Sequence, residues 1–151
     1  MIRLDHYTLR TRKPEETVRF YCAAVGLTEG WRPGFRFPGH WLYLGDRPVV
    51  HIVSITDNEN ELRGYTGKSG SEAGSGSIDH IAFRCDGLAD MQERLLGLGL
   101  PFRERVVPDL EQHQLFVQDP NGVTIELVFD HAPENQVRGE KVPAPVLAKA
   151  R

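Results

Sequence analysis

The sequence has little of what several classes of protein require. Only two of its 151 residues are cysteines, Cys22 and Cys85, which is too few for a disulfide framework and fits a reducing cytoplasm. Lys and Arg number 18 against 21 Asp and Glu, so a nucleic acid or an anionic membrane surface is not an expected partner. Apolar runs are only a few residues long, and the first ten residues contain no stretch of signal-peptide type. We therefore expect a cytoplasmic globular protein.

The most informative feature that is present is an internal repeat. Four stretches recur in the same order at offsets of 73 to 75 residues. The paired stretches are 4–10 with 78–84, 25–27 with 98–100, 40–46 with 113–119, and 50–53 with 125–128. The first pair shares an Asp-His dipeptide with an Arg four residues after the His. An ordered repeat of this kind predicts two copies of one structural unit.

Each copy has the residue pattern of a βαβββ unit. In the first copy we expect a helix that starts near Pro14 and stops at Gly26, and strands near 2–10, 27–31, 40–45 and 48–55. In the second copy we expect a helix near 88–98 and strands near 78–85, 102–107, 112–118 and 122–129. Apolar spacing predicts two buried helix stripes, which are Val18, Tyr21, Cys22 and Val25 in the first copy and Leu88, Met91, Leu95 and Leu98 in the second.

These expectations divide the chain into two modules, at about 1–56 and 78–130. Residues 57–77, rich in Gly, Ser, Asn and Glu, are expected to form a linker. The Asp-Pro-Asn-Gly sequence at 119–122 is typical of a turn that joins two strands as a hairpin. Residues 131–151 contain three prolines and mixed charges, and we expect an irregular tail there.

Alternation along the predicted strands places four possible metal ligands at matching positions. His6 and His80 lie on the first strands and His51 and Glu126 on the last strands, all on the face opposite the helices. Each of these histidines taken singly is more often a surface or hydrogen-bonded core residue than a ligand. Together, three imidazoles and a carboxylate are suited to Zn, Ni, Co, Mn or Fe(II). The repeat also equates His40 with His113, whose roles stay open between strand-edge structure and support of the site.

With this repeat and these candidate ligands, the sequence resembles the vicinal oxygen chelate superfamily, which includes glyoxalase I, extradiol dioxygenases and bleomycin-binding proteins. The motifs that carry the resemblance are 4–6, 20–21 with 25–27, 78–83 and 119–127. The resemblance implies an α+β fold of two tandem βαβββ modules that form an open, U-shaped mixed β-barrel with helices outside. It also matches His6, His80 and Glu126 to the family's metal ligands. His51 falls where glyoxalase I has a carboxylate that serves as ligand and base.

The resemblance implies a metal-dependent lyase or isomerase of glyoxalase type that acts on a small substrate with neighbouring oxygens. His51 and Glu126 are the expected catalytic residues, and His51 completes the expected metal set of His6, His80 and Glu126. Arg10 resembles an arginine that holds a substrate carboxylate in glyoxalase I, and Arg84 is its counterpart in the repeat. The alternatives are an Fe(II)- or Mn(II)-dependent ring-cleaving dioxygenase and a non-catalytic drug-binding protein. The family habit favours a homodimer.

Overall fold

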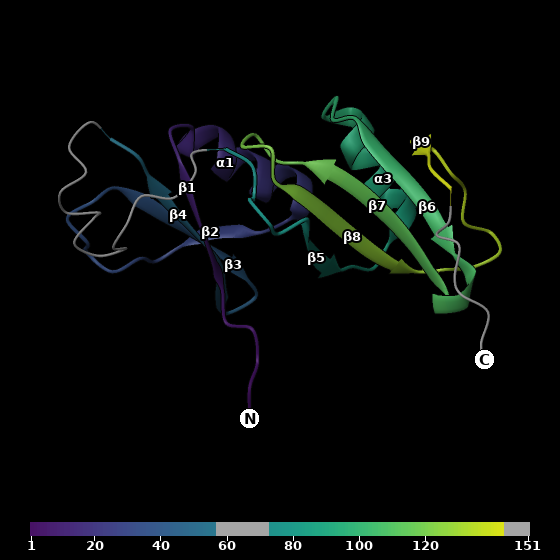
Figure 1. Ribbon diagram of the computed structural model, residues 1–151, viewed down its shortest axis with the longest axis horizontal. Coiled ribbons are helices and arrows are strands. Elements are labelled where there is room, and N and C mark those ends of the chain that lie inside the picture. Colours follow the sequence, from purple (N-terminus) through teal and green to yellow (C-terminus); the bar gives the residue numbers. More distant parts are fainter. Residues whose placement is uncertain (57–72, 144–151) are drawn as a thin grey trace. The chain divides into compact units, whose positions relative to one another are not determined.

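The computed structural model describes residues 1–56 and 73–143 and divides into two compact units (Figure 1). Unit 1 comprises Met1–Ser77 together with Asp119–Val123, and unit 2 comprises Ile78–Gln118 together with Thr124–Arg151. Within these described residues each unit contains a mixed β-sheet and one α-helix, so the predicted α+β class is confirmed. Residues 57–72 of the expected linker and 144–151 of the expected tail lie outside the described residues.

Unit 1 holds a four-stranded sheet in the order β1-β4-β3-β2. The elements are β1 (Tyr7–Thr11), α1 (Pro14–Phe20), a π-helical turn η1 (Tyr21–Val25), β2 (Thr28–Gly30), β3 (Gly39–Leu44) and β4 (Arg47–Ser54). β1 and β4 run parallel, and the other pairs are antiparallel. The first strand therefore begins at Tyr7 and not near residue 2, because Tyr7 is the first residue with a partner, Val50, on β4.

The helical segment of unit 1 starts and stops where its sequence predicts. Pro14 occupies the first turn of α1, Glu15 and Glu16 lie at its positive end, and Gly26 ends the segment at a φ of 94°. The residues that this segment buries are Thr17, Phe20, Tyr21 and Ala24. Tyr21 belongs to the predicted stripe, and each of the other three lies one position before a residue of that stripe. Thr17 can be buried because its hydroxyl donates a hydrogen bond to the Lys13 carbonyl.

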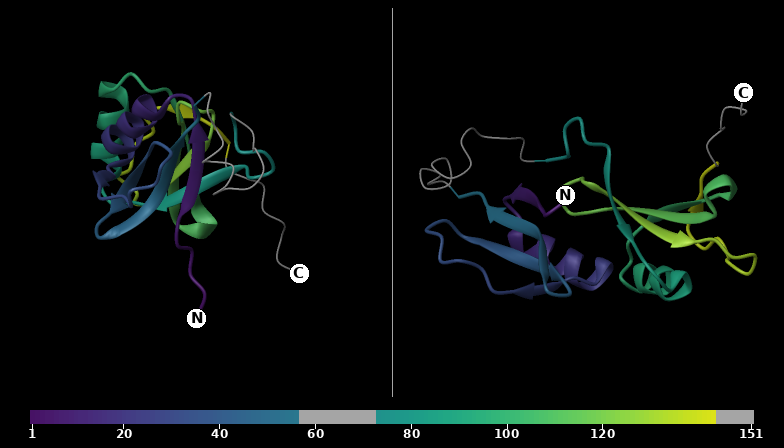
Figure 2. Two further views of the ribbon diagram at one scale, coloured as in Figure 1. Left: turned by 90° about the vertical axis from the view of Figure 1, so that its left-hand side faces the viewer. Right: turned by 90° about the horizontal axis from the view of Figure 1, so that it is seen from below.

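Unit 2 holds a five-stranded sheet in the order β5-β8-β7-β6-β9. The elements are β5 (His80–Arg84), α3 (Leu88–Gly97), β6 (Phe102–Val107), a 3-10 turn η2 (Pro108–Leu110), β7 (Gln112–Gln118), β8 (Thr124–Asp130) and β9 (Glu140–Lys141). β5 pairs with β8 and β9 with β6 in parallel, while β7 lies antiparallel between β6 and β8. α3 lies along one face of this sheet (Figure 2).

Two details of unit 2 differ from the sequence-based expectation. α3 buries Leu88, Met91, Gln92 and Leu95, whereas Leu98 lies beyond the helix end and is 46% exposed. The tail contains the short strand β9, which extends the sheet at the edge of β6. Gln92 can occupy the buried face of the helix because its side-chain amide donates hydrogen bonds to Glu104 on β6 and to the Gln136 carbonyl in the returning tail.

The Asp119–Val123 turn, which joins β7 to β8, packs within unit 1. Tyr21 donates a hydrogen bond to Asp119 Oδ2 at 2.9 Å. Burial raises the pKa of the Tyr21 phenol above its usual value, and the neighbouring Tyr7 and Asp119 raise it as well. Thr11 Oγ1 donates to Asn121 Oδ1, and the Asn121 side-chain amide donates to Thr17 Oγ1. The sequence predicted this turn as a hairpin connection but gave no sign that it docks on the first module.

Candidate functional site

In unit 1, three rings stack on the sheet face opposite α1. His51, in the middle of β4, lies between the indole of Trp41, its partner on β3, and the imidazole of His6, which precedes β1. The ring centroids are 3.9 Å apart for Trp41 and His51 and 3.8 Å apart for His51 and His6, with interplanar angles of 6° and 19°. The structure therefore brings the two predicted ligands of the first repeat together, and it adds the indole of Trp41 to them.

His51 is held in an environment that favours its neutral form. Burial, and then the neighbouring His6, lower the pKa of His51 below its ordinary value. Its Nε2 atom is buried and has no hydrogen-bond partner among the described residues. A buried nitrogen without a partner is costly unless a ligand or a transferred proton satisfies it.

In unit 2, the predicted ligands His80 and Glu126 are in contact. His80 Nε2 lies 2.8 Å from Glu126 Oε2, on the face of the sheet opposite α3. Although Glu126 carries a carboxylate, it is only 6% exposed, and its neighbours on β8, Ile125 and Leu127, are also buried. A carboxylate buried to this extent requires a cationic or hydrogen-bonding partner, and His80 supplies one.

Each unit contains an Asp-His dyad of its own. Asp5 Oδ2 lies 2.6 Å from His6 Nδ1, and Asp79 Oδ1 lies 2.8 Å from His80 Nδ1. A carboxylate on one ring nitrogen fixes the tautomer and leaves the other nitrogen as the metal-binding atom, which is the usual arrangement around metal-ligating histidines. In the His6 dyad Nε2 is therefore the nitrogen suited to a metal, whereas His80 Nε2 already contacts Glu126 and would have to exchange that contact for a metal.

The donor set fits a divalent transition metal, with one geometric restriction. Imidazole nitrogens and a carboxylate oxygen are the ligands that Zn and its neighbours prefer. An imidazole binds a metal in the plane of its ring, so the nearly parallel rings of His6 and His51 cannot both bind one ion as they are placed. Neither unit by itself brings three His, Cys, Asp or Glu side chains together as a metal cluster, within the part of the chain that is described.

The two predicted substrate-binding arginines lie in the first strands of their units. Arg10, in β1, is half-buried on the same sheet face as His51. Arg84, at the end of β5, forms an exposed ion pair with Asp130 at the end of β8. A substrate anion that binds Arg84 would therefore have to share or displace Asp130.

His40 and His113, whose roles the sequence left open, each pair with a glutamate on the neighbouring strand. His40 Nδ1 lies 2.6 Å from Glu29 Oε1, and His113 Nε2 lies 2.7 Å from Glu104 Oε2. In both units the histidine is two residues before the strand partner of the glutamate, Leu42 or Leu115. Sequence reasoning missed both glutamates, although they too are 75 residues apart and thus within the repeat.

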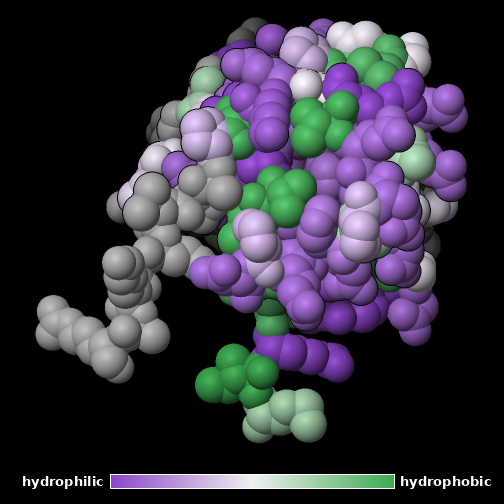
Figure 3. Space-filling view, turned by 90° about the vertical axis from the view of Figure 1, so that its right-hand side faces the viewer, coloured by the Kyte–Doolittle hydropathy of each residue, from purple (hydrophilic) through white to green (hydrophobic). Residues whose placement is uncertain are grey.

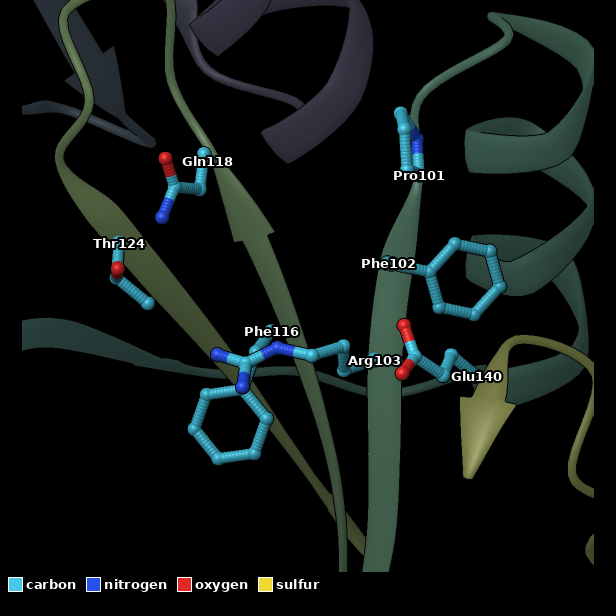
Figure 4. A pocket seen from close by; sticks show the side chains of 7 residues that line it. All are labelled: Pro101, Phe102, Arg103, Phe116, Gln118, Thr124 and Glu140. Carbon is cyan, nitrogen blue, oxygen red and sulfur yellow. The ribbon is translucent and has the colours of Figure 1, made fainter. Parts of the chain in front are cut away.

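Unit 2 also contains a pocket of about 260 Å³ on the sheet face that carries His80 and Glu126. Figure 4 shows the side chains that line it, which are Pro101, Phe102, Arg103, Phe116, Gln118, Thr124 and Glu140. None of these seven residues was singled out as a site residue from the sequence, because their proximity depends on the register between β6, β7, β8 and β9.

Comparison with known proteins identifies the family. The profile of the Glyoxalase/Bleomycin resistance protein/Dioxygenase superfamily matches residues 3–127. The chain belongs to this superfamily. The match spans both repeats and all four predicted ligands, so the resemblance seen in the sequence is confirmed. No curated protein matches the chain closely enough to be counted as a relative.

Solved structures of superfamily members share the fold. A protein assigned to the glyoxalase family from Bacillus anthracis is 20% identical, with a TM-score of 0.64 over 86% of this chain and 96% of that chain. A lactoylglutathione lyase from Agrobacterium tumefaciens is 16% identical, with a TM-score of 0.61 over 85% and 94%. The fosfomycin resistance protein FosX from Mesorhizobium loti is 24% identical, with a TM-score of 0.57 over 89% and 98%. At these identities the comparisons establish the fold.

In residues 1–56 and 73–143, no helix has both the length and the apolar character needed to cross a bilayer. The face drawn in Figure 3 is mostly hydrophilic, and apolar side chains appear on it in small groups.

Proposed function

We propose that the chain is a metal-dependent enzyme of glyoxalase type, a lyase or isomerase, whose divalent ion is bound by His6, His80 and Glu126. One observation supports this above the others: both repeats contain a histidine whose Nδ1 is held by the preceding aspartate. Glu126 adds a nearly buried carboxylate beside one of these histidines. The proposal includes the open, U-shaped barrel implied by the family, in which ligands of both repeats bind one ion, within one chain or across a homodimer.

His51 has a different role in this proposal from the other three residues. Its ring is held parallel to His6 and Trp41, so it can join the ligand set only if His6 or His51 turns out of the stack. We therefore assign His51 first to proton transfer through Nε2, the buried atom that has no partner among the described residues. Metal binding by His51 is its second role, reached after the ring turns.

The chemistry follows from the assigned groups. When bound, the divalent ion acts as a Lewis acid toward a substrate with two neighbouring oxygens, which makes an adjacent C–H proton removable. His51 Nε2 would accept that proton and return it to the neighbouring carbon, and the Glu126 carboxylate of the other repeat is the alternative group for the same proton shuttle. Arg10 and Arg84, at matching positions on the first strands, bind the anionic parts of the substrate. The lactoylglutathione lyase among the structural neighbours supports testing the adduct of methylglyoxal and glutathione first.

The direct test is turnover of this adduct by the full chain loaded separately with Zn, Ni, Co and Mn. Activity with at least one metal is expected, and His51→Ala should lower kcat far more than it lowers metal content. His131→Ala, in the tail, serves as the matched histidine control and should change neither. Absence of turnover with all four metals would reject this version of the function.

The stack of His6 and His51 also favours a second candidate, a ring-cleaving dioxygenase. If His51 stays outside the ligand set, His6, His80 and Glu126 form a two-histidine, one-carboxylate set with positions open for substrate and oxygen. Oxygen uptake by the Fe(II)-loaded protein with a panel of catechols separates the two candidates. An iron-loaded protein that consumes no oxygen with any catechol would eliminate this one.

A further inference from the structure

Unit 2 carries a continuous row of side chains that leads from the proposed metal ligands to the pocket. Phe116, in the middle of β7, is the strand partner of Glu126 on one side and of Arg103 on the other. Strand partners point to the same face of a sheet, so Glu126, Phe116 and Arg103 lie in line. The ring of Phe116 also meets the imidazole of His80 edge-on, at 6.3 Å between centroids. A molecule resting on Phe116 would therefore contact the ligand pair at one end and Arg103 at the other.

Two guanidinium groups converge on this ring. The Cζ atom of Arg105 lies 5.0 Å from the centroid of Phe116, and that of Arg103 lies 5.9 Å from it. Arg105 is positioned by a hydrogen bond from its Nε to Gln114 Oε1 at 2.8 Å. Among the described residues, neither guanidinium forms an ion pair with a carboxylate within 4.0 Å. Two like charges held beside one ring repel each other, and a bound anion would relieve that repulsion.

The pocket places polar groups around the same ring. In Figure 4, Arg103 reaches from β6 over Phe116, Gln118 and Thr124 lie beyond the ring, and Phe102 points away toward α3. A guanidinium beside an aromatic ring keeps its N–H edges available for an oxyanion. Glu140 lines the pocket on the far side of Arg103 from Phe116, so its negative charge opposes an anion there.

We propose that this pocket binds the anionic end, a carboxylate or a phosphate, of a small molecule whose apolar body lies on Phe116. Arg103, which lines the pocket, and Arg105, which stands beside the same Phe116 ring without lining the pocket, hold the anion, and Gln118 and Thr124 offer hydrogen bonds. A volume of about 260 Å³ has room for one carboxylate or phosphate group and a small apolar body. As a statement about substrate class, the inference rests on the proposed function, because the other end of the molecule is the part that would reach the metal.

Binding of simple aromatic anions to the full chain tests this directly. Phenyl phosphate and benzoate are the two anionic probes, and benzamide is the neutral probe of the same shape, all measured by calorimetry. We expect at least one anion to bind and benzamide to bind at least tenfold more weakly. Arg103→Gln and Arg105→Gln should each weaken anion binding about tenfold or more, as expected for a hydrogen bond to a charged group. Arg94→Gln, an exposed arginine on α3, is the control and should bind as the wild type does.

Glu140→Gln gives a test of opposite sign, because removal of the opposing charge should tighten anion binding. Each titration is repeated with and without Zn, and zinc affinity is measured for every variant. Wild-type zinc affinity in Arg103→Gln with weakened anion binding separates this site from the metal site. A pocket that binds phenyl phosphate equally with and without Zn would sustain the anion site while removing its link to the proposed function. Wild-type anion affinity in both arginine variants, or no binding of either anion, would overturn the proposal.

Discussion

The two units carry the same His-Glu pair in opposite environments. In unit 1 the side chains of His40 and Glu29 are 28% and 49% exposed, whereas in unit 2 those of His113 and Glu104 are fully buried. The register that produces the pair is identical, so the difference comes from what covers it. In unit 2 the tail crosses the pair, and Glu104 accepts hydrogen bonds from the backbone N–H groups of Arg138 and Gly139 and from the Gln92 amide. The pair of His40 and Glu29 therefore lies at the surface of unit 1, whereas Glu104 of the corresponding pair in unit 2 binds the tail.

Removal of the glutamate should show this difference most strongly. Glu104→Ala leaves His113 and two backbone donors without their acceptor and removes one of the two acceptors of Gln92, and we expect a loss of about 3–5 kcal/mol in the free energy of unfolding. Glu29→Ala removes an exposed pair and should cost about 0–1 kcal/mol. Urea unfolding of both variants gives the comparison. Equal losses would mean that burial under the tail does not strengthen the pair.

The pH dependence of stability should also come from the buried copy. Burial opposes ionisation of Glu104, but the hydrogen bonds from Gly139, His113, Arg138 and Gln92 lower its pKa below the ordinary value of 4.5. A carboxyl with a lowered folded-state pKa stabilises the fold above its unfolded pKa, and that contribution is lost as pH falls from about 4.5 through the folded value. The free energy of unfolding would be measured between pH 6 and pH 3. We expect this part of its decrease at low pH to be absent in Glu104→Gln and present in Glu29→Gln. An unchanged profile in Glu104→Gln would contradict the assignment.

The close approach of the tail can be blocked at one glycine. A methyl group on Gly139 would lie 2.5 Å from the Phe102 ring and 2.7 Å from its carbonyl oxygen, so the tail must shift. We expect Gly139→Ala to cost about 1–3 kcal/mol, the usual cost of overpacking, and to raise amide exchange in residues 138–142. Gly97→Ala, at the end of α3 with open space around it, is the matched control and should not destabilise. Protection of the tail equal to that of the wild type would show that the docking tolerates the methyl group.

The smallest effect is expected in unit 1, where Tyr21 holds the Asp119–Val123 turn. Tyr21→Phe removes one hydrogen bond, but Asp119 still accepts from the backbone N–H groups of Asn121 and Val123. The expected loss is about 0.5–1.5 kcal/mol, with faster amide exchange confined to the turn. Tyr43→Phe, which removes an exposed hydrogen bond to the Trp31 carbonyl, should cost less. A larger loss in Tyr43→Phe would reverse the proposed importance of the two phenols.

The sequence predicted elements better than the contacts between them. β6 and β7 have the predicted bounds, since their alternation is sharp and flanked by turn residues. The predicted buried stripe of the first helical segment was right at Tyr21 and wrong at its other positions, because hydropathy assigned Cys22 and Val25 to the core, whereas the fold buries Thr17, whose hydroxyl donates a hydrogen bond to the Lys13 carbonyl. The partners of Glu104 could not be predicted, since they depend on strand register and on a tail that returns to β6.

The same limit applies to the candidate site. The repeat was sufficient to select His6, His51, His80 and Glu126, because matching positions in two strands share a face. The stack of Trp41, His51 and His6 required the register of β3 on β4, which no single-strand pattern contains. Register also decides that Phe116 stands between Glu126 and Arg103.

The central claim is that one divalent ion is bound by ligands from both repeats, and metal affinity tests it most directly. Zinc and nickel affinities would be measured for the wild type and for His6→Ala, His80→Ala, Glu126→Ala, His51→Ala and His131→Ala, with circular dichroism as the check of folding. The first three variants should each lose more affinity than the roughly 10–100-fold caused by changes around a site, because each removes a direct ligand. His51→Ala should lose less, and His131→Ala should match the wild type. Wild-type affinity in folded His80→Ala and Glu126→Ala would contradict the claim.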